Sequence, residues 1–317
     1  MKNIICVNNM SKRYKNGSEE ILKNISFEVN YGETFGILGG NGAGKSTLIK
    51  ILATMLLHDS GDVLVLDKNV IDQYEYIKNH INFVFGGENG MYFRLTSEEY
   101  LKYFSLLYKI DSHTIGSKID HLLKVVGLLP YKNNKIETFS KGMIQRLHIA
   151  RSLINDPKIL FLDEPTIGLD PKGTEMLKNV IREISKNGVT VILTTHYMIE
   201  AENLCDRVLF LNKGEIELIN SPSNLINNLS EKYSKFELII KKSMITKLNT
   251  AFPEIIIKEN KKMNTDFTNI NCICSHHLNS KFLKYLEVEC KINDSFIESK
   301  KMNLEDVFLY HFDLKIS

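Results

Sequence analysis

Short apolar runs that end in polar residues recur along the first two thirds of the chain. Four of them indicate buried strands, at residues 34–38, 81–85, 159–162 and 190–195. They are continuous rather than alternating, as in parallel strands that helices cover on both faces. Apolar residues at helical spacing follow the first run, over residues 48–56. The pattern predicts an α/β fold with ligands at the carboxyl ends of its strands.

The pattern changes after about residue 222, where the chain becomes polar and rich in turn-forming residues. Strand and helix signals then follow the order β-α-β-β-α-β before a terminal helix, which suggests a small ferredoxin-like module. We therefore expect a first domain over residues 1–222, a linker over residues 223–235 and an accessory α+β domain over residues 236–317.

Composition limits the partners that this chain can have. Of its 317 residues, 43% are hydrophobic and 25% are charged, as in globular proteins. A net charge of +2 supplies no broad field for nucleic acid. The sequence has no apolar run near the roughly 20 residues that span a bilayer, and its N-terminus lacks a signal peptide's apolar core. We expect a cytoplasmic protein that reaches any membrane through a partner.

The five cysteines are scattered, which fits reduced thiols in such a compartment. Cys272 and Cys274 precede His276 and His277, and this cluster invites interpretation as a metal site. Residues two apart on a strand point to the same side, however, and the spacing is not that of zinc ligands. Core packing of the two thiols is the favoured interpretation.

A phosphate-binding loop is the most specific motif before the acidic strand. Its sequence, GGNGAGKST, has the spacing Gly-x4-Gly-Lys-Ser between a strand and a helix. Glycines let backbone N–H groups turn inward around phosphates, and the helix start adds its positive dipole end. Lys45 would neutralise the β and γ phosphates, and the Ser46 hydroxyl would ligate Mg²⁺. The predicted nucleotide-binding residues are Gly39, Gly40, Asn41, Gly42, Ala43, Gly44, Lys45, Ser46 and Thr47.

Two acids end the apolar run at residues 159–162. Asp163 would hold the Mg²⁺ shell through water. Glu164 would face the water that attacks the γ phosphate and act as general base or orienting group. Acids also occur as plain caps of strands, but beside a phosphate loop the catalytic interpretation is favoured.

The segment TFSKGMIQRLHIA, residues 138–150, narrows the class of nucleotide hydrolase. A Ser hydroxyl and a flexible Gly at a helix start form an anion site. The pattern resembles the signature of the ATP-binding cassette (ABC) ATPases, although Lys141 and Met143 depart from the commoner residues. The resemblance covers residues 3–220. It implies a P-loop NTPase cassette with a RecA-like core, an antiparallel β subdomain and an α-helical subdomain, followed here by the small α+β module.

The resemblance also implies that the cassette works in pairs. Ser140, Lys141 and Gly142 would complete the ATP pocket of a second copy, so that two ATP molecules join two cassettes. Asp170 would signal between the two copies, a role compatible with its position as helix N-cap before Pro171.

Two more positions match the family, and one does not. His196 follows the run at residues 190–195, where the family has a switch histidine that contacts the γ phosphate and the attacking water. Tyr14 lies where the family stacks an aromatic ring on adenine, although a surface aromatic in a loop would look the same. After residues 81–85 the family usually has a Gln, and here Gly86 takes its place. Glu88, Asn89 or water would supply the missing oxygen ligand; the alternative is a catalytically weak cassette.

The helical region and the C-terminus point to a membrane partner through the same resemblance. The aromatic-rich stretch of residues 94–110, with the loop before it, receives the permease's cytoplasmic helix in the family. We expect Leu101, Phe104 and Tyr108 to pack inward. The ending MNLEDVFLYHF resembles a motif of exporter ATPases related to daunorubicin resistance and sodium extrusion. An ordinary amphipathic helix would give the same pattern.

The sequence therefore predicts an ATP-binding and ATP-hydrolysing subunit with Mg²⁺ as cofactor. It would power a separate permease that exports a small molecule, drug, peptide or ion, from the inner face of the cell membrane. The alternatives are a soluble ABC ATPase that acts on ribosomes or DNA, and a regulatory cassette with weak catalysis. The transported substrate is not readable, because in this family the permease selects it.

Overall fold

The computed structural model describes residues 2–14, 19–85, 90–261, 266–290, 292 and 297–312. It divides the chain into two compact units, Met1–Asn220 and Ser221–Ser317. Within the described ranges, no helix has the length and apolar character that crossing a membrane requires.

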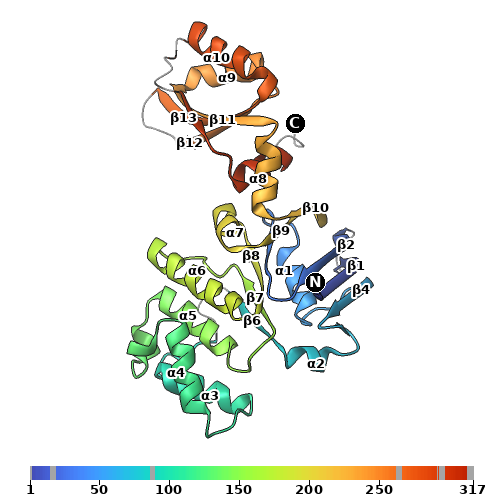
Figure 1. Cartoon of the computed structure of the whole chain (residues 1–317), viewed down its shortest axis with the longest axis vertical. Coiled ribbons are helices and arrows are strands. Elements are labelled where there is room, and N and C mark those ends of the chain that lie inside the picture. The colour runs from blue at the N-terminus through green and yellow to red at the C-terminus, as the bar shows by residue number, and fades with distance from the viewer. Residues whose placement is uncertain are drawn as a thin grey trace. The chain divides into compact units, whose positions relative to one another are not determined.

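A six-stranded sheet forms the centre of the first unit, in the order β10-β9-β3-β8-β7-β6. Its strands are β3 (Thr34–Leu38), β6 (Ile81–Phe85), β7 (Ile159–Asp163), β8 (Thr190–Thr195), β9 (Arg207–Asn212) and β10 (Glu215–Asn220). All neighbours are parallel except β9 and β10. β3 and β8 are buried along their whole length, because helices cover both faces (Figure 1). The parallel α/β arrangement predicted from the continuous apolar runs is confirmed.

A second, antiparallel sheet lies on one side of the central sheet, with the order β2-β1-β4-β5 (Figure 1). Its strands are β1 (Asn3–Arg13), β2 (Glu20–Asn30), β4 (Ser60–Val65) and β5 (Lys68–Asn69). Side chains from β1, β2 and β4 share one buried apolar cluster with α1 (Lys45–Leu52) and β3. The short α2 (Tyr74–Lys78) then leads into β6.

Helices fill the other side of the first unit. They are α3 (Ser97–Leu107), α4 (Ile115–Val125), α5 (Lys141–Ser152), α6 (Pro171–Lys186) and α7 (Met198–Leu204), with short 3-10 turns at Leu129–Tyr131 and Ile136–Thr138. α3 begins with the expected capping box of Thr96 and Glu99. Leu101 packs inward as expected, but Tyr108 is 40% exposed and Tyr100 is fully buried instead. The buried face of α3 is therefore formed by residues 97, 100, 101 and 105, and of the predicted stripe it includes only Leu101.

The second unit begins earlier than expected. Residues 223–235, predicted as a linker, instead form α8 (Pro222–Ser230) and the start of β11 (Tyr233–Lys241). Ser221 caps α8 by accepting a hydrogen bond from Asn224 N at 3.2 Å, and Pro222 stands at its first position. Leu225 and Leu229, four residues apart, are both buried. A cap and two spaced leucines are enough for a docked helix in an otherwise polar stretch.

The rest of the second unit follows the order β-α-β-β-α-β. Its elements are β11, α9 (Lys242–Ala251), β12 (Ile256–Lys261), β13 (Phe267–Ser275), α10 (Asn279–Val288) and β14 (Ile297–Lys300), with a 3-10 turn at His276–Leu278 and the final α11 (Leu304–Phe312). The strands form one antiparallel sheet in the order β12-β13-β11-β14. Cys272 and Cys274 are completely buried in its apolar core.

α11 is held to β11 by buried polar contacts as well as by apolar packing. Lys235 Nζ lies 2.8 Å from Asp306 Oδ2, and both side chains are almost fully buried. The same Asp306 oxygen accepts a hydrogen bond from Asn303 N at 2.8 Å, so it also caps the helix start. The Asp of the Leu-Glu-Asp stretch thus holds the terminal helix against the sheet.

Candidate nucleotide-hydrolysis site

The register of the central sheet brings the ends of four strands to the same level. Leu38 is paired with Thr195, Asp163 with Thr194, and Phe85 with Asp163. The described residues that follow β3, β7 and β8 therefore meet at the carboxyl edge of the sheet, where open α/β sheets bind their ligands. The phosphate-binding loop begins there, directly after β3.

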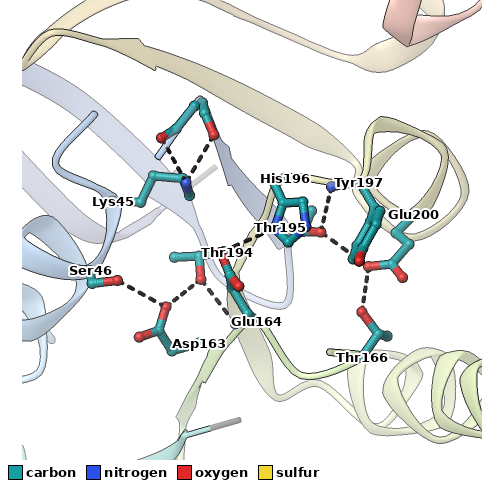
Figure 2. Close-up of polar contacts among 12 residues, drawn as sticks. Lys45, Ser46, Asp163, Glu164, Thr166, Thr194, Thr195, His196, Tyr197 and Glu200 are labelled. Atoms are coloured by element: carbon teal, nitrogen blue, oxygen red, sulfur yellow. Dashed lines mark hydrogen bonds and ion pairs between the residues drawn. The ribbon is translucent and has the colours of Figure 1, made fainter. Parts of the chain in front are cut away.

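Lys45 points back into this loop. Its ammonium donates hydrogen bonds to Gly39 O at 2.8 Å and to Gly40 O at 3.0 Å (Figure 2). The side chain is buried, and burial lowers the pKa of Lys45, while nearby Glu164 and Asp163 act in the opposite direction. Gly39 and Gly44 have φ values of +155° and +105°. An added Cβ at Gly39 would lie 2.2 Å from Leu211 O, so only glycine fits the loop there.

Ser46 and Asp163 lie side by side. The Ser46 hydroxyl is 3.4 Å from Asp163 Oδ1, and Thr194 Oγ1 donates to the same carboxylate oxygen at 2.5 Å (Figure 2). The hydroxyl of Ser46 in α1 and the carboxylate of Asp163 at the end of β7 thus meet beside the phosphate loop. Oxygen ligands of this kind are those that Mg²⁺ prefers.

Glu164 and His196 contact each other next to that pair. Glu164 Oε1 lies 3.2 Å from His196 Nδ1. Glu164 has φ +48°, and its N–H donates to Thr194 Oγ1 at 3.0 Å. A non-glycine residue in this region of backbone conformation is uncommon and tends to mark functional sites. The turn after β7 thereby directs the Glu164 side chain towards the histidine.

Four further polar residues lie behind this pair that sequence reasoning missed. Thr166 and Thr195 both donate hydrogen bonds to Glu200 Oε2, at 2.7 and 3.1 Å, and all three side chains are buried. Thr194 joins Asp163 to the Glu164 backbone, as described above. The one sequence signal for them is that Thr194 and Thr195 interrupt an otherwise apolar strand immediately before His196.

The signature turn lies at the start of α5. Ser140 Oγ accepts a hydrogen bond from Met143 N at 3.3 Å, and Lys141 is exposed. Gly142 is buried against α6, where an added Cβ would lie 3.4 Å from Gly173 Cα. Among the described residues, the hydrogen bonds of Ser140 stay in α5 and do not join it to Lys45 or Glu164.

Asp170 caps α6 as predicted. Its Oδ1 accepts a hydrogen bond from Gly173 N at 3.0 Å, and Pro171 occupies the first helical position. The apolar face of α6 is buried as its spacing predicts, through Leu177, Val180, Ile181 and Ile184.

Tyr14 directly follows β1 and is 43% exposed. A hollow of about 770 Å³ opens beside this strand end, and its described lining includes Arg13, Gly42 of the phosphate loop and Lys213. Tyr14, the predicted adenine-stacking residue, therefore directly follows Arg13, which lines the same hollow as Gly42 of the phosphate loop. The positions that concern the missing Gln, namely Gly86, Glu88 and Asn89, lie outside the described residues.

A phosphate loop after β3, paired acids at the end of β7 and a Ser-x-Gly helix start together define a nucleotide hydrolase of the ATP-binding cassette class. The sequence model of the family described as ABC transporter matches residues 22–167. The chain is 36% identical over 215 residues to the ABC transporter ATP-binding protein NatA of Bacillus subtilis (strain 168), covering 67% of this chain and 87% of the relative. The chain belongs to the family of ABC transporter ATP-binding proteins and is an ATPase that binds ATP.

Another relative and two solved structures are also ATP-binding cassette proteins. The Fluoroquinolones export ATP-binding protein MT2762 of Mycobacterium tuberculosis (strain CDC 1551 / Oshkosh) is 40% identical over 224 residues, 70% of this chain and 72% of the relative. The structure of cbiO1 from Clostridium perfringens, part of the ABC transporter complex cbiONQ, superposes with a TM-score of 0.68 at 28% identity, covering 80% of this chain and 97% of cbiO1. A dimeric ATP-binding cassette, MJ0796, bound to ADP and Pi has a TM-score of 0.60 at 28% identity, covering 68% and 98%.

Proposed function

We propose that this chain is the ATP-hydrolysing subunit of an exporter, and that it powers a separate membrane permease. The observation that carries the proposal is the contact of 3.2 Å between Glu164 and His196, one residue from the Asp163 carboxylate that faces Ser46. Export is supported by relatives named Fluoroquinolones export ATP-binding protein and Linearmycin resistance ATP-binding protein, the latter 37% identical over 221 residues. The exported substrate would be a small molecule, drug, peptide or ion.

The phosphate loop would hold the triphosphate of ATP. Residues 39–47 would wrap backbone N–H groups around it, and Lys45 would exchange its carbonyl partners Gly39 and Gly40 for the β and γ phosphate oxygens. Ser46 and Asp163 fit Mg²⁺, because both offer oxygens and lie within 3.4 Å of each other. When bound there, the metal would neutralise charge on the β and γ phosphates.

Glu164 would act as general base. Water attacks the γ phosphorus, its proton passes to the Glu164 carboxylate, and the bond from the γ phosphorus to the bridging oxygen breaks, releasing ADP and phosphate. His196 contacts Glu164 through Nδ1, which leaves its Nε2 to contact the γ phosphate or the attacking water. His196 would in this way report whether ATP is intact.

The signature turn would act on a second copy of the chain. Ser140, Lys141 and Gly142 present a helix start with a hydroxyl and a cation, which suits the γ phosphate of ATP held by the partner. Asp170, at the start of the neighbouring helix α6, would signal between the copies. Tyr14 would stack on adenine.

The permease would dock on the helical side of the first unit. Tyr92, Phe93 and Tyr103 are each at least 40% exposed there, so an aromatic surface is available to a cytoplasmic helix of the permease. The chain would then sit at the inner face of the cell membrane through this partner. Pull-down from solubilised membranes should recover a polytopic protein; ribosomal proteins in its place would contradict the proposal and favour a ribosome-acting ATPase.

Substitution of the base provides the direct test. Glu164→Gln keeps the size of the side chain but cannot take a proton, so ATP binding should be retained while kcat falls by about 10²- to 10⁴-fold. Steady-state ATPase assays and ATP-binding titrations measure the two effects separately. A parental rate in the variant would overturn the base assignment, and a parental chain without ATPase activity would favour a regulatory cassette.

A further inference from the structure

Glu200 is a buried acid that the proposed mechanism does not use. It lies in α7, is 7% exposed, and forms no ion pair with any residue in the described ranges. Its side chain accepts two hydrogen bonds from threonine hydroxyls, and both end on the same oxygen, Oε2. Burying an acid without a cation is unfavourable, and an apolar side chain would fill this space with less penalty. We therefore take the two hydrogen bonds to the threonine hydroxyls as the structural role of Glu200.

The two threonines belong to different loops of the active site. Thr166 lies two residues after Glu164, in the turn that follows β7, and donates to Glu200 at 2.7 Å. Thr195 is the last residue of β8, directly before His196, and donates at 3.1 Å. Figure 2 shows the Glu200 carboxyl group between them.

Thr195 also fixes the chain beyond the histidine. Its Oγ1 accepts a hydrogen bond from Tyr197 N at 3.0 Å, so the same hydroxyl that donates to Glu200 holds the residue after His196. His196 is thereby flanked on both sides by residues in this network. On the other loop, the Thr166 C=O accepts a hydrogen bond from Leu169 N at 3.1 Å, which closes a tight turn.

We propose that Glu200 is a positioning residue that holds the loop of the general base and the loop of the switch histidine in register. The contact of 3.2 Å between Glu164 and His196 spans these two loops, and each loop reaches Glu200 through one hydroxyl. Loss of this joint lets the two side chains separate, and displacements of about 1 Å can lower a rate by roughly 10²-fold. The inference rests on the roles proposed above for Glu164 and His196.

The test compares Glu200→Ala with Glu200→Gln in the full-length chain. The Gln side chain keeps an oxygen that accepts both hydroxyl hydrogen bonds, whereas Ala keeps none. We expect Glu200→Ala to lower kcat by roughly ten- to a hundredfold with less than about a threefold change in KM for ATP. We expect Glu200→Gln to stay within about threefold of the parental kcat. Equal losses in both variants, or a parental kcat in Glu200→Ala, overturn the proposal.

Thr166→Val keeps the shape of the threonine without its hydroxyl and serves if Glu200→Ala folds poorly. It should lower kcat on its own, and it should cause no further loss in the Glu200→Ala background, because both changes break the same link. Additive losses would overturn a shared positioning role. Thr166→Ser, which keeps the hydroxyl, should retain the parental kcat.

Glu33→Ala is the matched control for burial of an acid. Glu33 is also 7% exposed, but it precedes β3 at the opposite edge of the sheet and contacts Arg207 at 3.3 Å. Its loss should lower stability and leave kcat per folded molecule unchanged; a fall in kcat equal to that of Glu200→Ala would assign both effects to general destabilisation. Glu164→Gln, run in parallel, separates failure of the base assignment from failure of the role of Glu200.

Discussion

His148 lies inside the first unit on α5 and is 2% exposed. Its Nε2 has no hydrogen-bond partner among the described residues. Burial, with a smaller contribution from nearby Arg151, lowers the pKa of His148 to about 4 from its usual 6.5. The folded chain therefore keeps this imidazole neutral in a pH range where the unfolded chain protonates it.

The neutral imidazole of His148 makes the stability of the first unit depend on pH. Between pH 6.5 and 4 the unfolded state binds the proton and the folded state does not, so stability is complete above pH 6.5 and falls as the pH drops. A shift of this size corresponds to at most about 3 kcal/mol. We expect the free energy of unfolding of the first unit, measured by urea titration from pH 7.5 to 4.5, to fall less steeply in His148→Leu. An unchanged slope would contradict the role of His148.

Residues with fixed spacing from a strand end could be predicted from the sequence. Lys45, Asp163, Glu164 and His196 each stand next to an apolar run, and the register of the sheet brings their side chains to one edge. Glu200 could not be found in this way. Its burial depends on how α7 folds back against the turn at Thr166, which the sequence pattern does not encode.

At the scale of elements, apolar spacing gave the type of element more reliably than its buried face. The stripe predicted on α3 shares Leu101 with the buried face but misses Tyr100, because the side of α3 that meets α5 is set by tertiary packing. Tyr100 receives a hydrogen bond from Arg151 at 3.3 Å, and that guanidinium also lies over the Phe104 ring. The half-buried Arg151 thus contacts both Tyr100, which is buried, and its neighbour Phe104.

The terminal helix α11 offers a prediction about stability. Asp306→Ala would leave Lys235 buried without its partner and remove the acceptor for Asn303 N. We expect the second unit to lose about 3–5 kcal/mol of unfolding free energy, because an uncompensated buried charge is strongly unfavourable. The double change Lys235→Met with Asp306→Leu should lose less than Asp306→Ala alone.

An exposed pair on the same helix supplies the control. Glu305 contacts Lys258, and both side chains are more than a third exposed. Glu305→Ala should therefore change the unfolding free energy by less than about 1 kcal/mol. Denaturant titration of all three variants checks the series; a loss in Glu305→Ala equal to that in Asp306→Ala would contradict the importance of burial.

At the scale of the whole molecule, we expect the site to be completed by a second copy of the chain. Among the described residues, Ser140 forms its hydrogen bonds within α5 rather than with Lys45. A related cassette is dimeric with ADP and Pi bound. We expect ATP to join two copies of this chain when hydrolysis is blocked, since each copy would supply one wall of both sites.

Light scattering tests this expectation. The Glu164→Gln chain should double in mass from 36.4 kDa when ATP and Mg²⁺ are added. Gly142→Asp in the same background places a negative charge at the anion site, so it should prevent the doubling while leaving ATP binding to the phosphate loop intact. A Glu164→Gln chain that stays monomeric at saturating ATP would contradict the paired arrangement.

The level strand ends of the central sheet have a consequence for how this chain can change over time. β3, β6, β7 and β8 each end at about the same level of the sheet, and β3, β7 and β8 each lead into a separate loop of the candidate site. The sequence of one such loop can therefore change while the strand that precedes it keeps its pairing in the sheet. Gly86, at the position where ABC ATPases usually have a Gln, directly follows β6 in the sequence. The exchange of Gln for Gly at this position is local in sequence, and the site residues that follow β3, β7 and β8 are all retained.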